Sequence, residues 1–117
     1  MPAELGNTNR RDGFLFREVV SLQLQLAGID ATARTGYLTD PEEPHSHLTG
    51  VADWAFEVRT QKRRDLAGAL EEAQAAAEHD GKRHGVAIFK KFSAPTKDSY
   101  VVLPLQTFAT LISKSQA

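Results

Sequence analysis

The stretch DLAGALEEAQAAAEHDG, residues 65–81, constrains the fold more than any other part of the chain. Its apolar residues recur at helical spacing, Asp65 can cap the start of the helix, and Gly81 can end it. The apolar face is mostly alanine, whose small side chain lets a helix lie close to a sheet. Strand-like apolar segments precede and follow it, at residues 52–59 and 84–92. The sequence therefore predicts an α/β fold with helices packed on a sheet.

The same periodicities predict the remaining elements. Residues 11–27 match a helix that Gly28 ends. Its apolar stripe consists of Leu15, Val19, Leu22 and Leu26, with Phe16 and Val20 beside it. Strands are expected over 29–35, near 47–49 and over 99–105. A closing helix over 106–114 is expected to face Phe108, Leu111 and Ile112 inward. The predicted order is α-β-β-β-α-β-β-α.

Length and composition limit the classes of protein that fit. With 117 residues, the chain is expected to form a single domain over residues 9–117, after a flexible tail at residues 1–8. It has no cysteine, no long apolar run and no signal-peptide pattern, so a cytoplasmic protein without a membrane partner is expected. Residues 59–97 carry nine Lys and Arg against five Asp and Glu, a balance compatible with phosphate binding.

In the strand segment ADWAFEVR, residues 52–59, a carboxylate and a guanidinium stand two residues apart, at Glu57 and Arg59, and this pair requires an explanation. Because successive side chains point to opposite faces of a strand, Glu57 and Arg59 share one face, while Trp54, Phe56 and Val58 form the other, core-facing side. Taken alone, such a pair is typical of an ion pair on an exposed sheet face. The basic run that follows it, and the order of the surrounding elements, suggest a further interpretation.

Four segments together resemble the PD-(D/E)xK nuclease superfamily, and most closely its Holliday junction resolvase-like proteins of phages and archaea. These segments are RRDGFLFREVV, SHLTGVADWAFEVRTQ, LAGALEEAQAAAEHDGKRHGVAIFKK and YVVLPLQTFATLI. The resemblance spans roughly residues 10–113. It implies a restriction-endonuclease-like fold, with a central mixed β-sheet flanked by helices.

The resemblance also implies a site. Glu57, Arg59 and Glu18 fall at its catalytic positions, and Glu57, His47 and Glu18 fall at its metal-binding positions. The implied cofactor is Mg²⁺ or Mn²⁺, which carboxylate oxygens suit. Two positions depart from the family pattern, because His47 stands where an Asp is expected and Arg59 where a Lys is expected.

Each departure weakens the implied chemistry. Imidazole suits Zn²⁺ or Mn²⁺ better than Mg²⁺, and a guanidinium cannot be deprotonated to activate water. Hydrolysis is therefore doubtful. His45 and His47 either bind Zn²⁺ together with Glu57 or are plain surface residues, and the sequence leaves both open.

The predicted function is binding of branched or structured DNA by a homodimer, and the expected partner is branched or duplex DNA. The residues expected to contact DNA are Lys62, Arg63, Arg64, Lys90 and Lys91. One alternative is an active metal-dependent endonuclease. The other is a catalytically inactive relative, phage-encoded and acting in the host cytoplasm, that uses the fold to bind a host protein.

Overall fold

The computed structural model describes residues 2–34 and 44–116, with side chains described from Asp12 onward. Residues 35–43, which begin with the last residue of the strand expected over 29–35, lie outside the described residues. The elements in chain order are α1 (Pro2–Leu26), β1 (Thr32–Ala33), β2 (Leu48–Thr49), β3 (Trp54–Arg59), α2 (Leu66–His79), β4 (His84–Phe89), the 3-10 helix η1 (Thr96–Asp98), β5 (Tyr100–Val102) and α3 (Leu105–Ser115). The predicted α/β class is confirmed.

The described strands form two sheets, where the sequence predicted one central sheet. The larger has the order β3-β4-β5, with β3 parallel and β5 antiparallel to β4. The smaller is the antiparallel pair β1-β2. Between the segment before β2 and β3, one backbone bond, from His47 N–H to the Phe56 carbonyl (2.8 Å), alternates with side-chain acceptors. Phe56 N–H donates to Ser46 Oγ (2.9 Å) and Val58 N–H donates to His47 Nδ1 (2.8 Å).

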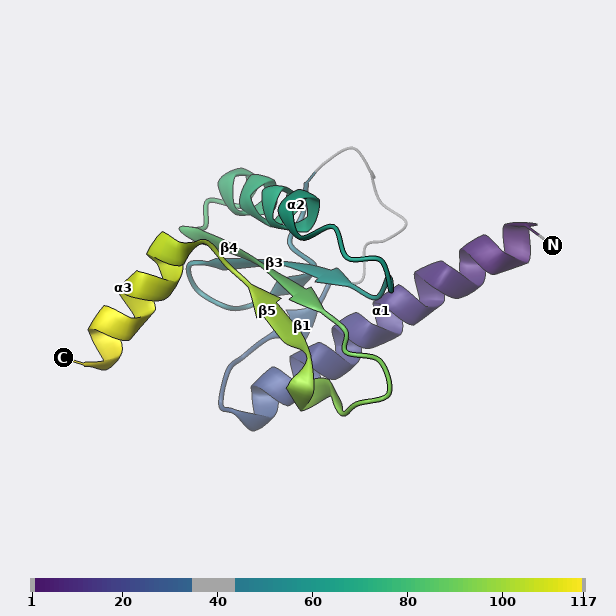
Figure 1. Cartoon of the computed structure of the whole chain (residues 1–117), viewed down its shortest axis with the longest axis horizontal. Helices are drawn as coiled ribbons and strands as arrows, with labels where there is room; N and C mark the ends of the chain where they lie inside the picture. The colour runs from purple at the N-terminus through teal and green to yellow at the C-terminus, as the bar shows by residue number, and fades with distance from the viewer. Residues whose placement is uncertain (1, 35–43, 117) are drawn as a thin grey trace.

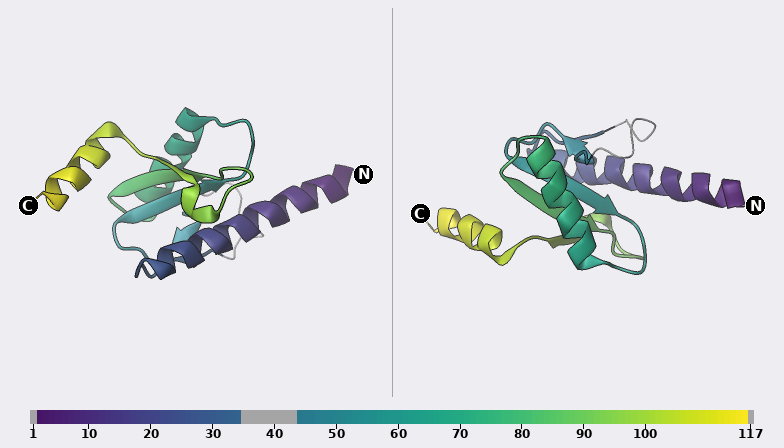
Figure 2. Two further views of the ribbon diagram at one scale, coloured as in Figure 1. Left: turned by 60° about the horizontal axis from the view of Figure 1, so that its bottom comes forward. Right: turned by 90° about the horizontal axis from the view of Figure 1, so that it is seen from above.

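The larger sheet lies between two helices, α1 on one face and α2 on the other (Figures 1 and 2). The core on the α1 side consists of Phe16, Val20, Leu48, Phe56, Val58, Val86 and Ile88, with Trp54 packed against it as predicted. On the α2 side, small residues of the helix meet Ala55, Ala87 and Phe89. The predicted helix–sheet packing is therefore present on both faces.

Helix α2 is capped at both ends as the sequence predicted. The Asp65 carboxylate accepts a hydrogen bond from Gly68 N–H (2.9 Å), which satisfies one of the first backbone donors of the helix. Gly81 follows the helix with a φ of 68°, and Lys82 N–H donates to the Ala77 carbonyl (2.7 Å). This left-handed glycine turn ends the helix and directs the chain into β4.

Helix α1 presents a different face to the core from the one predicted. Phe16 and Val20 are each only 4% exposed, and Leu24 packs beside them. The residues of the predicted stripe remain exposed: Leu15 at 49%, Val19 at 41%, Leu22 at 55% and Leu26 at 83%. The helix has two adjacent apolar stripes, and the one that carries phenylalanine packs against the sheet.

Two further expectations are corrected at the ends of the chain. Helix α1 begins at Pro2, so residues 2–8 are helical where a tail was predicted, and its first turns extend beyond the sheet (Figure 1). Helix α3 lies at the other end of the molecule and buries none of its residues. Phe108, Leu111 and Ile112, which were expected to face inward, are 49%, 39% and 38% exposed. Among the described residues, no helix is long and apolar enough to cross a membrane.

Substitution of Gly85 by alanine tests the close approach of α2 to β4. A Cβ at Gly85 would collide with the backbone carbonyl of Ala73 and the backbone nitrogen of Gln74. We expect Gly85→Ala to lower the free energy of unfolding by about 1–3 kcal/mol, measured by urea denaturation.

Gly13→Ala is the matched control, because a Cβ at Gly13 meets no atom within 4 Å and the residue lies inside α1. It should raise stability by about 0.5–1 kcal/mol through helix propensity. Equal effects of the two substitutions would contradict the packing described.

Candidate functional site

The Glu57 carboxylate lies on β3, the edge strand of the larger sheet, and both of its oxygens are engaged. Arg59 Nε donates to its Oε2 (2.8 Å), and His47 Nε2 lies 3.3 Å from its Oε1. The Glu57 side chain is only 13% exposed. Burial raises the pKa of Glu57 above its ordinary value, while the bond from Arg59 opposes that rise. The structure thus forms the Glu57–Arg59 pair that the strand pattern predicted.

His47 is held between the backbone of β3 and this carboxylate. Its Nδ1 accepts from Val58 N–H, so the neutral ring carries its proton on Nε2 and directs it toward Glu57. Burial, followed by the positive charge of Arg17, lowers the pKa of His47 to about 3. Protonation of Nδ1 would also remove the bond from Val58. His47 is therefore an uncharged hydrogen-bond partner at neutral pH.

Glu18 is not part of this cluster. At about 100° per residue, Glu18 lies roughly 160° from the centre of the buried stripe of α1, whereas Arg17 lies roughly 60° from it. Glu18 is accordingly exposed. The α1 residue that interacts electrostatically with Glu57 is Arg17. Burial lowers the pKa of Arg17. Arg17 Nε is buried and has no hydrogen-bond partner among the described residues.

The residues present do not fit the Mg²⁺ or Mn²⁺ site that the resemblance implied. Within the described residues, Glu18, His47 and Glu57 do not bring three ligand atoms within 4.8 Å of one another. The exposed Glu72 of α2 acts on Glu57 only through its charge, and the guanidinium groups of Arg17 and Arg59 oppose a divalent cation beside Glu57. The cluster is better described as an ion-paired carboxylate at the sheet edge.

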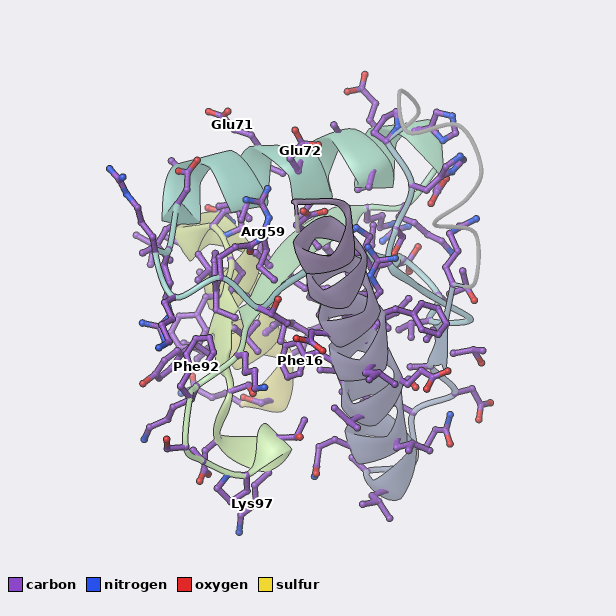
Figure 3. All side chains as sticks on the ribbon, turned by 90° about the vertical axis from the view of Figure 1, so that its right-hand side faces the viewer. Phe16, Arg59, Glu71, Glu72, Phe92 and Lys97 are labelled. Atoms are coloured by element: carbon purple, nitrogen blue, oxygen red, sulfur yellow. The ribbon has the colours of Figure 1, made fainter. Side chains whose placement is uncertain are left out.

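A groove opens where β3 and β4 end. Because these strands are parallel, their carboxyl ends lie side by side, and the segments that follow them form one wall of the groove. The volume of the groove is about 790 Å³. Its lining residues are Thr60, Gln61 and Lys62 after β3, Lys90, Phe92, Ala94 and Thr96 after β4, and Asp12, Leu15, Phe16 and Val19 of α1. Figure 3 shows Phe16 and Phe92 on one side of the molecule, with Arg59 between them and α2.

Lysine ammonium groups surround an aromatic ring in this groove. Lys62 Nζ lies 5.7 Å and Lys90 Nζ lies 5.5 Å from the centre of the Phe92 ring. Phe16 forms the floor, since it is only 4% exposed. Neither lysine pairs with a described carboxylate. The groove therefore offers positive charge and an aromatic face together.

The other predicted DNA-contacting residues take different positions. Arg64 bonds the Lys90 carbonyl (3.2 Å) and stacks over Tyr100 (5.0 Å), so it joins the segments after β3 and β4. Arg63 and Lys91 are exposed and do not line the groove. The sequence interpretation missed Phe92 and Arg17. Phe92 directly follows Lys90 and Lys91, and an aromatic residue beside two lysines could have indicated the groove from the sequence.

If His47 is uncharged in the folded chain, the free energy of unfolding should depend on pH in a specific way. Between pH 6.5 and about 3, the unfolded chain binds a proton at this ring and the folded chain does not, so stability falls as pH falls. The slope from this group is at most about 1.4 kcal/mol per pH unit. Glu57 contributes the opposite sign above pH 4.5, because its folded pKa is raised.

Comparison with His47→Asn separates the two groups. Asparagine can still accept from Val58 N–H but does not titrate, so the variant should lose less stability on acidification than the wild type. Urea unfolding at a series of pH values measures the difference. Parallel pH profiles for the two proteins would show that His47 titrates normally in the folded state.

The site thus combines an ion-paired carboxylate at the sheet edge with a basic, aromatic groove beside it. No protein-family model matches the chain, and no match is found among curated proteins or solved structures.

Proposed function

We propose that the chain binds nucleic acid with unpaired bases, as in single-stranded or branched DNA, and does not cleave it. The observation that carries this proposal is the groove at the ends of β3 and β4. There Lys62 and Lys90 lie within 6 Å of the Phe92 ring, in a space large enough for a nucleotide. Proteins that bind single strands combine cationic grooves with exposed aromatic faces in the same way.

The chemistry of the groove favours unpaired bases over a regular duplex. A base can stack on Phe92, which is partly exposed, only when its own face is free. The two lysines would then contact flanking phosphates. The exposed Leu15 and Val19 of α1 supply an apolar wall for the sugar and base. A branch point or single strand offers unstacked bases, whereas a continuous duplex does not.

The state of Glu57 supports binding without hydrolysis. Both of its oxygens are engaged, by Arg59 and by the neutral His47 ring, and Arg17 adds positive charge. A hydrolytic role would require this carboxylate to leave its partners and hold a metal ion. The same guanidinium groups that oppose a metal ion would favour a phosphate close to the sheet edge.

Equilibrium binding to labelled DNA tests the proposal. We expect a single strand and a four-way junction to bind more tightly than a duplex, without cleavage in Mg²⁺ or Mn²⁺. Phe92→Ala should weaken binding by about 1–3 kcal/mol through lost stacking. Lys62→Ala and Lys90→Ala should each weaken binding and reduce the salt slope by about 0.7.

Two further variants sharpen the experiment. Asp12 is the one carboxylate that lines the groove, so Asp12→Asn should tighten binding. Lys114→Ala removes an equal charge from the exposed surface of α3, outside the groove, and should change little. Equal losses for Lys62→Ala and Lys114→Ala would point to general charge attraction. Metal-dependent cleavage that Glu57→Ala abolishes would overturn the proposal that the chain does not cleave DNA.

A second candidate function, self-association, rests on α3. An isolated helix of 11 residues is marginal in water, and α3 buries none of its residues within the chain. Leu105, Phe108, Leu111 and Ile112 form an exposed apolar stripe along it. We propose that a second copy of the chain covers this stripe. A two-fold, antiparallel pairing sets the stripe against itself and keeps the two Lys114 charges at opposite ends.

Light scattering after size-exclusion chromatography tests this pairing. The wild type should show a concentration-dependent dimer, which Phe108→Glu should abolish because it places a charge in the apolar seam. Gln106→Glu adds the same charge on the opposite face of α3 and should preserve the dimer. A monomer at every concentration tested would contradict self-association and leave a different protein as the partner of α3.

A further inference from the structure

A cluster of two histidines and an aspartate lies apart from the groove, at the carboxyl end of α2. His79 is the last residue of the helix, Asp80 follows it, and His45 comes from the segment before β2. One ligand atom from each residue lies within 4.8 Å of the others. The sequence interpretation grouped His45 with His47 and Glu57. The structure instead directs His45 toward Asp80 (3.9 Å from Nδ1 to Oδ1).

The two oxygens of Asp80 have separate surroundings. Oδ2 accepts from Ser46 N–H (3.2 Å) and lies 3.5 Å from the Arg34 guanidinium. Oδ1 faces both imidazoles, 3.0 Å from His79 Nδ1 and 3.9 Å from His45 Nδ1. Bonds to one oxygen therefore fix the carboxylate and aim the other at two nitrogen donors. Metal-binding carboxylates in proteins are commonly oriented by such outer partners.

We propose that His45, His79 and Asp80 bind a Zn²⁺ ion. With metal–ligand bonds of about 2.0–2.1 Å, tetrahedral ligand atoms lie roughly 3.3 Å apart, and the separations from Oδ1 fall on either side of that value. The rings meet edge to face, with centroids 4.9 Å apart. Two imidazoles and one carboxylate suit a borderline cation better than Mg²⁺ or Ca²⁺.

The surroundings leave room for exchange of the ion and of a fourth ligand. The side chains are 27% (His45), 38% (His79) and 16% (Asp80) exposed, so solvent reaches the cluster. Water can complete the tetrahedron. A bound ion would join the end of α2 to the segment that carries Ser46 and His47, and so would support the edge of β3.

Calorimetric titration of the full chain with Zn²⁺ alone tests the proposal. We expect one ion per chain, with binding weakened at least tenfold by His45→Ala and by His79→Ala. His84→Ala is the matched control, since His84 packs against Trp54 outside the cluster, and it should bind as the wild type does. Zn²⁺ should also raise the melting temperature of the wild type and of His84→Ala but not that of His79→Ala.

The position of the ion is tested separately. His47→Asn should leave the Zn²⁺ affinity unchanged, because His47 belongs to the Glu57 cluster. Tetrahedral absorption bands from Co²⁺ in the same site should appear in the wild type and disappear in the His45→Ala, His79→Ala double variant. Absence of binding, binding that survives in the double variant, or loss of binding in His47→Asn would each overturn the proposal.

Discussion

The hydrogen bond from Val58 N–H to His47 Nδ1 is the contact on which the site depends. It joins β3 to the segment before β2 through a side chain, beside the backbone bond from His47 N–H to the Phe56 carbonyl (2.8 Å). It also sets the tautomer, which turns the protonated Nε2 toward Glu57. Because the ring is buried beside Arg17, its pKa falls to about 3 and it stays neutral. Glu57 therefore keeps two partners, Arg59 and His47, at neutral pH.

The packing of α1 is the second constraint. Because α1 packs against the sheet through the Phe16–Val20–Leu24 stripe, Arg17 lies near Glu57 and Glu18 faces solvent. The same orientation lays Leu15, Phe16 and Val19 along the groove at the ends of β3 and β4. The orientation of α1 therefore keeps Glu18 away from the sheet edge and forms one wall of the groove. The proposed binding function follows from these two consequences together.

Much of the fold was accessible from local patterns, whereas the site was not. Caps at Asp65 and Gly81 depend on neighbouring residues, and the alanine face of α2 depends on helical spacing, so both were predicted and are confirmed. The face of α1 depends on which of two adjacent stripes fills the core, which periodicity alone does not decide. Glu57 with Arg59 followed from strand alternation. The engagement of His47 with Val58 joins residues 11 apart through a side chain, a contact that no sequence period encodes.

The paired state of Glu57 and the expected lack of cleavage both depend on the protonation of the His47 ring, which can be measured directly. Long-range proton–nitrogen correlation by NMR reads the protonation of each ring nitrogen. We expect an unprotonated Nδ1, a protonated Nε2 and no change as the pH is lowered from neutral to about 5. A ring that titrates near its ordinary pKa of 6.5, or that carries its proton on Nδ1, would show that His47 does not hold Glu57 as described.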